Sequence, residues 1–160
     1  MQILCALRDV SSFLVVFPPD LLPQTIKQTT TTTVIVNADP HTEGGSHRLA
    51  VHFRPKSSSA YYLDSYGILP LIPRIQAFIK RNCTTWDYNW LQLQGLTSDV
   101  CGKYRCPFAL YLDRSHTPYQ FISHFNACDN ADQQVERIFT AEFGVQMPRG
   151  GWGQCCRSCL

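Results

Sequence analysis

Residues 46–64 read SHRLAVHFRPKSSSAYYLD, and this run predicts a β-hairpin. Its first nine residues alternate between apolar and polar side chains, the pattern of a strand with one buried face. A turn led by proline follows, and the last five residues form a second strand. Because hairpin strands run antiparallel, we expect His47 at the start of the first strand to lie near Asp64 at the end of the second.

The other elements are predicted from hydrophobic periodicity and from the residues that begin or end helices. Short β-branched or aromatic runs on either side of the hairpin predict two further strands. Four later segments have helical spacing, two of them with proline in the first turn and the last followed by glycine. The predicted strands cover 34–36 and 86–93, and the predicted helices cover 73–82, 108–112, 117–125 and 129–143.

Strands in the middle of the chain followed by grouped helices predict an α+β fold, with a central mixed β-sheet flanked by helices. Residues 1–28 are expected to be irregular, and the threonine tract at 29–33 is expected to be a loop or an edge-strand insertion. We expect a single domain over residues 1–145 and a flexible tail, rich in glycine and cysteine, over 146–160.

Composition limits the class of protein. The chain has 160 residues, of which 44% are hydrophobic and 16% charged, which excludes an intrinsically disordered or coiled-coil chain. A net charge of +2 is too small to predict nucleic-acid binding, because such domains usually carry a clustered basic face.

No apolar run approaches the roughly 18 residues of a membrane-spanning helix. The short run Phe13–Phe17 ends at two prolines, and the basic residue near it is wrongly placed for a secretory leader. We therefore expect an intracellular protein of the cytoplasm or nucleus that is not secreted. Its eight cysteines are then expected to be thiols, metal ligands or catalytic groups rather than a disulfide framework.

Four residues are candidates for the parts of a cysteine protease site. Such a site needs an activated thiol, an imidazole base, a group that orients the imidazole, and donors for the developing oxyanion. Cys101 precedes Gly102 and an apolar segment, so a helix N-terminus there would favour the thiolate. His47 and Asp64 would supply base and carboxylate across the hairpin, and Gln94 lies shortly before Cys101.

The four motifs occur in a specific order, namely GGSHRLA at 44–50, AYYLDSYG at 60–67, QG at 94–95 and CG at 101–102. Together they resemble the adenovirus-type (adenain-like) cysteine protease family, which includes proteases encoded by Maverick/Polinton-type transposons and related viruses. The resemblance implies the papain-unlike cysteine protease fold that this family shares with ubiquitin-like-protein proteases. It also implies a cysteine endopeptidase that processes viral or transposon structural precursors.

By this resemblance each candidate residue receives a role. Cys101 is the nucleophile, His47 the general base and acid, Asp64 the orienting carboxylate and Gln94 an oxyanion-hole donor. Cys83 falls near the cysteine through which the adenoviral enzyme takes up an activating peptide. The implied partners are a polypeptide substrate, an activating peptide and DNA, with no cofactor, no metal and no membrane.

Two residues depart from the family pattern. Arg48 stands where the family usually has tryptophan directly after its histidine. Pro107 lies behind Cys101, so the helix is expected either to kink there or to begin at Pro107. These departures leave an alternative function open, a binding domain that keeps the protease fold but has lost catalysis.

Other histidines and cysteines fit these roles less well. His52 should lie on the opposite strand face from His47 and at the surface. Cys106 is more than a helical turn from Cys101 and is a poor alternative nucleophile. A zinc or redox module remains a further alternative, because thiolates can bind zinc, although only one closely spaced cluster is present. Its ligands would be Cys101, Cys106, Cys155, Cys156 and Cys159.

Overall fold

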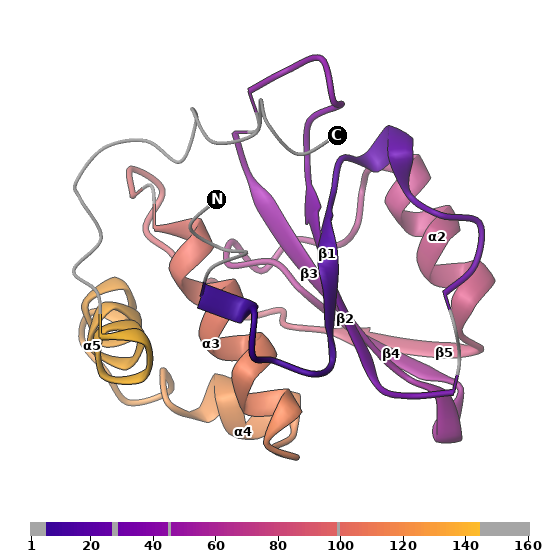
Figure 1. Ribbon diagram of the computed structural model, residues 1–160. Helices are drawn as coiled ribbons and strands as arrows, with labels where there is room; N and C mark the ends of the chain where they lie inside the picture. The colour runs from indigo at the N-terminus through magenta and orange to yellow at the C-terminus, as the bar shows by residue number, and fades with distance from the viewer. Residues whose placement is uncertain (1–5, 27–28, 45, 99, 145–160) are drawn as a thin grey trace.

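A five-stranded mixed sheet forms the centre of the molecule (Figure 1). The structure is a computed structural model that describes residues 6–26, 29–44, 46–98 and 100–144. The strand order is β1-β2-β3-β4-β5; β3 pairs antiparallel with both neighbours, whereas the outer pairs β1–β2 and β4–β5 are parallel. The strands are β1 Phe13–Phe17, β2 Thr32–Asn37, β3 Arg48–Arg54, β4 Ser59–Leu63 and β5 Thr85–Tyr88.

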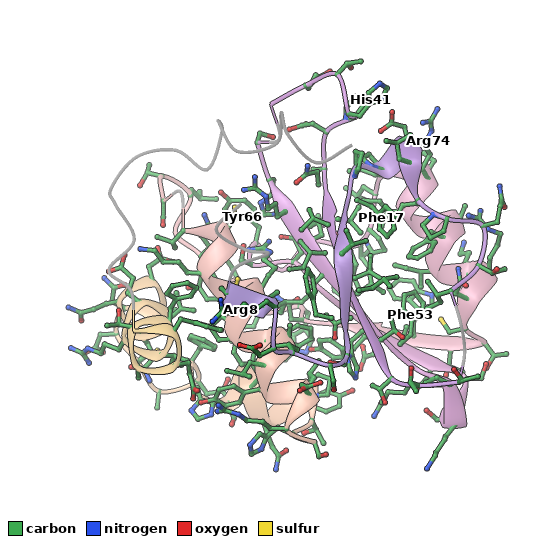
Figure 2. All side chains as sticks on the ribbon, in the orientation of Figure 1. Arg8, Phe17, His41, Phe53, Tyr66 and Arg74 are labelled. Carbon is green, nitrogen blue, oxygen red and sulfur yellow. The ribbon has the colours of Figure 1, made fainter. Side chains whose placement is uncertain are left out.

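Helices cover both faces of the sheet. One face carries α2, and the other carries α3, α4 and α5 (Figure 1). Side chains fill the space between the sheet and the helices on both sides (Figure 2). The prediction of an α+β fold, with a mixed central sheet flanked by helices, is confirmed. The helices are α2 Pro73–Asn82, α3 Cys101–Asp113, α4 Pro118–Ser123 and α5 Ala131–Phe143, with short 3-10 turns η1 Pro19–Leu21 and η2 Pro55–Ser57.

The predicted hairpin is β3 and β4, but its buried surface is larger than predicted. Ala50 belongs to the core under α3, whereas Val51 belongs to the core under α2, so both faces of β3 are covered. The prediction that this strand is buried on only one face is therefore wrong, and so is the predicted surface position of His52. That side chain is only 2% exposed, and its Nδ1 is 2.9 Å from Thr33 Oγ1. Burial and the charge of Arg54 lower the pKa of His52 to about 4.

The residues predicted to begin and end helices do so. In α4 the N-cap Thr117 and Gln120 form a reciprocal capping box, and α5 starts after the N-cap Asn130 and ends at the left-handed Gly144. α3 is longer than predicted, since it begins at Cys101 and continues through Pro107. A helix that starts only at Pro107 is therefore wrong.

Differences from the predicted elements are concentrated near the N-terminus and around β5. Phe13–Phe17 is a strand and not part of an irregular segment. β2 starts within the threonine tract and lies between β1 and β3, so the end of that tract is in an inner strand. β5 ends at Tyr88, and the chain then runs without regular structure toward Gln94. The predicted domain boundary at residue 145 and the tail at 146–160 lie outside the described residues.

Candidate active site

The hairpin brings His47 and Asp64 together. His47 directly precedes β3 and Asp64 directly follows β4, so antiparallel pairing places both at the same end of the hairpin. His47 Nε2 lies 2.9 Å from Asp64 Oδ1, and both side chains are largely buried. A carboxylate can only accept, so Nε2 carries the proton and donates it to Asp64.

This hydrogen bond decides what the other ring nitrogen of His47 can do. In the neutral ring Nδ1 then has a free lone pair, as a proton acceptor requires. Nδ1 is buried and has no nitrogen or oxygen partner among the described residues. Burial lowers the pKa of His47, but hydrogen bonds with Asp64 and Cys101 outweigh it and raise the pKa above its usual value.

A tight turn holds the Asp64 carboxylate in place. The Tyr66 N–H donates to Asp64 Oδ1 at 2.9 Å, and the Gly67 N–H donates to the Asp64 carbonyl at 2.9 Å. From the far side Asn89 accepts from the Asp64 N–H at 2.9 Å, and its amide nitrogen donates to the Asp64 carbonyl. The sequence carried no signal for Asn89, which lies just beyond β5.

Gly67 is required in this turn for two reasons. Its φ is +70°, a region that L-residues rarely adopt, and a Cβ would lie 2.9 Å from the backbone nitrogen of Gln92. We expect Gly67→Ala to lower the free energy of unfolding by about 2–5 kcal/mol, through left-handed strain plus overpacking. Urea denaturation measures the loss.

Gly144→Ala is the matched control for Gly67→Ala. Gly144 has φ +64°, but a Cβ there would meet nothing within 4 Å. Its substitution should cost only the conformational strain of about 1–2 kcal/mol. Equal losses in the two variants would contradict a tight contact between the turn and the backbone at Gln92.

Cys101 is the first residue of α3, and the residue is 5% exposed. Burial raises the pKa of Cys101, but a hydrogen bond with His47, the charges of Arg105 and His47 and a backbone hydrogen bond with Arg48 lower it to about 7. The helix N-terminus acts in the same direction, because its dipole favours an anion. The thiol therefore ionises near neutral pH despite its burial. Arg48, which departs from the family pattern, is itself buried.

Gln94 lies next to this group and is held from both ends of its amide. Its Oε1 accepts from Ser65 Oγ at 2.6 Å, and its Nε2 donates to the Ser98 carbonyl. Nε2 also lies 3.4 Å from the Tyr66 hydroxyl, a weak contact. The Tyr66 ring, labelled in Figure 2, lies beside His47 with ring centroids 4.8 Å apart.

Arg105 enters the site from α3, and nothing in the sequence pattern predicted its contacts. Its side chain is completely buried, and Nη1 donates to the Cys101 carbonyl and to Ser65 Oγ, the latter at 3.0 Å. Nη2 lies 3.5 Å from His47 Nε2. The described structure therefore joins His47, Asp64, Cys101 and Gln94 through short contacts that Ser65, Tyr66 and Arg105 complete.

Cys83 and Cys106 lack such an environment. Cys106 is completely buried, and burial raises its pKa to about 12. The Cys83 thiol donates to the Ile79 carbonyl, and burial raises its pKa as well. No group of three or more histidine, cysteine, aspartate or glutamate side chains suited to a metal ion occurs within the described ranges. The three cysteines of the predicted zinc cluster at 155–159 lie outside those ranges.

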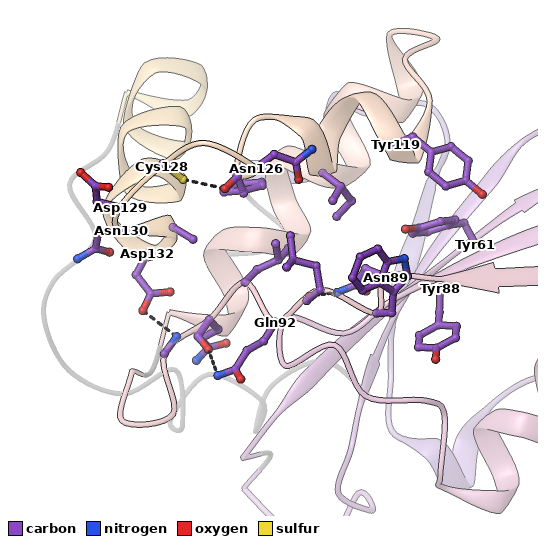
Figure 3. A pocket seen from close by; sticks show the side chains of 18 of the residues that line it. Tyr61, Tyr88, Asn89, Gln92, Tyr119, Asn126, Cys128, Asp129, Asn130 and Asp132 are labelled. Atoms are coloured by element: carbon purple, nitrogen blue, oxygen red, sulfur yellow. Dashed lines mark hydrogen bonds between the residues drawn. The ribbon is translucent and has the colours of Figure 1, made fainter.

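A groove of about 1030 Å³ runs from β5 to the start of α5 and includes Gln94 and Gly95 in its wall. We call it the aromatic groove; Tyr61 and Tyr119 lie at one end, and Asp129 and Asp132 lie at the other (Figure 3). Trp90, also in its wall, is 80% exposed. His47 and Cys101 do not line the groove, so it adjoins the site at Gln94 rather than containing it.

No helix among the described residues is long and apolar enough to cross a membrane.

Comparison with known proteins finds a partial likeness. No protein-family model matches the chain, and no curated protein matches its sequence. Among solved structures it is similar to the ASFV pS273R protease in its selenomethionine form, with a TM-score of 0.49 and 19% identity over 74% of this chain and 45% of that one. A second crystal structure of that protease has a TM-score of 0.46 and 16% identity over 74% and 44%. The chain thus spans less than half the length of the protease.

Proposed function

We propose that this chain is a cysteine peptidase whose nucleophile is Cys101, of the adenain-like type that transposons and related viruses encode. One observation carries the proposal. A buried thiol at a helix N-terminus has its pKa lowered to about 7 by His47, Arg105 and the Arg48 backbone, and Asp64 fixes the His47 imidazole. Reactive cysteines are found in electropositive settings of this kind, whereas structural cysteines are not.

The proposed reaction depends on the Cys101 sulfur and on His47 Nδ1. His47 Nδ1 takes the thiol proton, and the Cys101 sulfur attacks the carbonyl carbon of a peptide bond to form a tetrahedral oxyanion. As this collapses to a thioester, the His47 Nδ1–H protonates the leaving amine. Water then attacks the thioester with His47 as base, which releases the carboxylic acid product and restores the thiol.

Gln94 is proposed to stabilise the oxyanion together with the backbone N–H of Cys101. One proton of the Gln94 amide is used by the Ser98 carbonyl. The other proton faces the Tyr66 hydroxyl, which lies 3.4 Å from Nε2 and makes only a weak contact. An oxyanion can therefore accept this proton without the loss of a strong hydrogen bond. Ser65 fixes the far end of the amide, which is the preorganisation that such donors require.

The proposed substrate is a polypeptide, such as a viral or transposon structural precursor, and the proposed location is intracellular. The aromatic groove supports a polypeptide, because it leads to Gln94 and is lined by rings against which an extended chain can pack. An activating peptide bound through Cys83 has no support in the contacts, since the Cys83 thiol donates to the Ile79 carbonyl and has a raised pKa. No contact among the described residues supports a DNA cofactor either.

A site-resolved alkylation experiment tests whether the site is activated. We expect the rate at which iodoacetamide modifies Cys101 to rise with a midpoint near pH 7, because the thiolate is the nucleophile. Cys83 is the internal control, since its pKa is raised. At neutral pH Cys101 should react at least about tenfold faster, although Cys83 is the more exposed. Mass spectrometry of peptides measures both rates.

The result also decides between the two functions. If Cys101 reacts no faster than Cys83 at neutral pH, the thiol is not activated. In that case the chain is a binding domain that has lost catalysis.

A further inference from the structure

The guanidinium of Arg105 is a buried charge without a carboxylate partner. Its side chain is completely buried, and no carboxylate within the described part of the chain lies within ion-pair distance of it. Its Nε is also buried and has no hydrogen-bond partner there. Taking a cation out of water costs several kcal/mol after relaxation, so such a group persists only where other charges or dipoles compensate it.

The compensation comes from the candidate active site. Nη1 donates to the Cys101 carbonyl and to Ser65 Oγ, whereas Nη2 lies 3.5 Å from the protonated His47 Nε2 and gains no acceptor there. Burial lowers the pKa of Arg105, while nearby anionic groups oppose that change and one further cation adds to it. The titratable groups that face it are on its own helix, on the hairpin and in the turn after the hairpin. They are Cys101, Tyr104 and Cys106 from α3, His47, Arg48, Tyr62 and Asp64 from the hairpin, and Tyr66 from the turn.

Cys101 is the anion to which Arg105 is most closely tied. The two residues are four positions apart in α3, so they lie one above the other on the same face of the helix. The thiol in turn faces His47, Arg105 and, more weakly, the Tyr66 hydroxyl. Asp64 is already engaged by His47 Nε2 and the Tyr66 N–H.

We propose that Arg105 is a positioning residue that keeps Cys101 in its thiolate form independently of the charge on His47, and that it holds Gln94 in place through Ser65. This inference rests on the proposed function. In a site with one cation, the thiolate loses its partner when rising pH removes the proton of the imidazole. Here the guanidinium stays charged at every pH that a protein tolerates, so it still stabilises the thiolate when the imidazole is neutral.

The link to Gln94 is a chain of two hydrogen bonds. Arg105 Nη1 donates to Ser65 Oγ at 3.0 Å, and Ser65 Oγ donates to Gln94 Oε1 at 2.6 Å. The forked guanidinium reaches Ser65 and the Cys101 carbonyl at once, which the single ammonium of a lysine does less well. Arg105→Lys should therefore keep most of the electrostatic effect and lose part of the positioning.

The test is the pH profile of Cys101 alkylation in four full-length variants. In His47→Ala we expect the midpoint to remain below that of an ordinary thiol, because Arg105 is still present. In Arg105→Gln we expect the midpoint to rise by about one unit, which lowers the alkylation rate at neutral pH about tenfold. Arg105→Lys should lie between Arg105→Gln and the unmodified protein. Arg114→Gln, which removes an exposed arginine at the end of the same helix, should leave the midpoint of Cys101 alkylation unchanged.

Two results would overturn the inference. The first is a return to the ordinary thiol midpoint in His47→Ala alone, a measurement that does not depend on Arg105→Gln being folded. The second is an unchanged midpoint in an Arg105→Gln protein whose circular dichroism is native. A purely structural role for Arg105 would change stability and leave the midpoint where it is.

The outcome can be separated from that of the proposed function. If the protein cleaves peptides and the Arg105 variants keep the midpoint of Cys101 alkylation, only the proposed role of Arg105 is wrong. If the low midpoint depends on Arg105 but the protein cleaves no peptide, only the proposed peptidase function is wrong.

Discussion

Cys101→Ala is expected to abolish peptide cleavage, with a loss of about 10⁶-fold in kcat, the size seen when a covalent nucleophile is removed. Alanine deletes the sulfur and leaves the start of α3 and the His47–Asp64 pair unchanged. Incubation with a mixed peptide library, read by mass spectrometry for new termini, measures the loss. The variant should still bind the peptides, since the aromatic groove is intact.

Cys106→Ala is the matched control for this experiment. Like Cys101→Ala, it removes one sulfur atom from α3, but at a completely buried position whose thiol has a pKa raised to about 12. We expect it to keep cleavage and to lose stability by only a small cavity term. Cleavage that survives in Cys101→Ala would show that the nucleophile lies elsewhere.

Gln94→Ala is expected to lower kcat by about 10²–10³-fold, or about 2.7–4 kcal/mol of transition-state stabilisation, as for the loss of other oxyanion-hole donors. KM should change little, because the amide is proposed to act on the oxyanion and not on the bound peptide. The kinetics of one cleaved peptide, taken from the library, supply both constants.

Stability must be measured alongside, since Gln94 is only 1% exposed and its loss leaves Ser65 without an acceptor. An unpaired buried polar group of this kind costs about 1–3 kcal/mol. Gln92→Ala is the control, because Gln92 lies in the same segment and its side chain reaches only the Gln94 carbonyl. Equal effects on kcat in the two variants would contradict an oxyanion role for Gln94.

The hairpin was predictable because its information is local. Strict alternation and a proline-led turn fix which residues pair, and pairing alone brings His47 to 2.9 Å from Asp64. Helix boundaries at Thr117 and Gly144 were readable for the same reason, since caps act within one turn, whereas the predicted start of the last helix at residue 129 lies two residues before the first residue of α5. β1 was missed because five apolar residues beside two prolines give too little signal for a strand.

Properties that depend on distant segments were not predictable. Alternation along β3 cannot reveal that α2 covers one face and α3 the other, so the burial of His52 was missed. The contacts of Arg105 and Asn89 depend on where α3 and the segment after β5 dock against the turn at Asp64. Arg105 is one of the groups that lower the pKa of Cys101, and Asn89 holds the backbone of Asp64, yet no motif in the chain predicts either contact.

The division of the site between the β3–β4 hairpin and α3 has a consequence for the newly made chain. Residues up to Asp64 leave the ribosome first, and they can pair His47 with its carboxylate while Cys101 is still being synthesised. Until α3 docks, Cys101 has neither imidazole nor buried neighbours and behaves as an ordinary thiol. In the proposed peptidase, Cys101 would therefore become a reactive nucleophile only once α3 has docked on the hairpin.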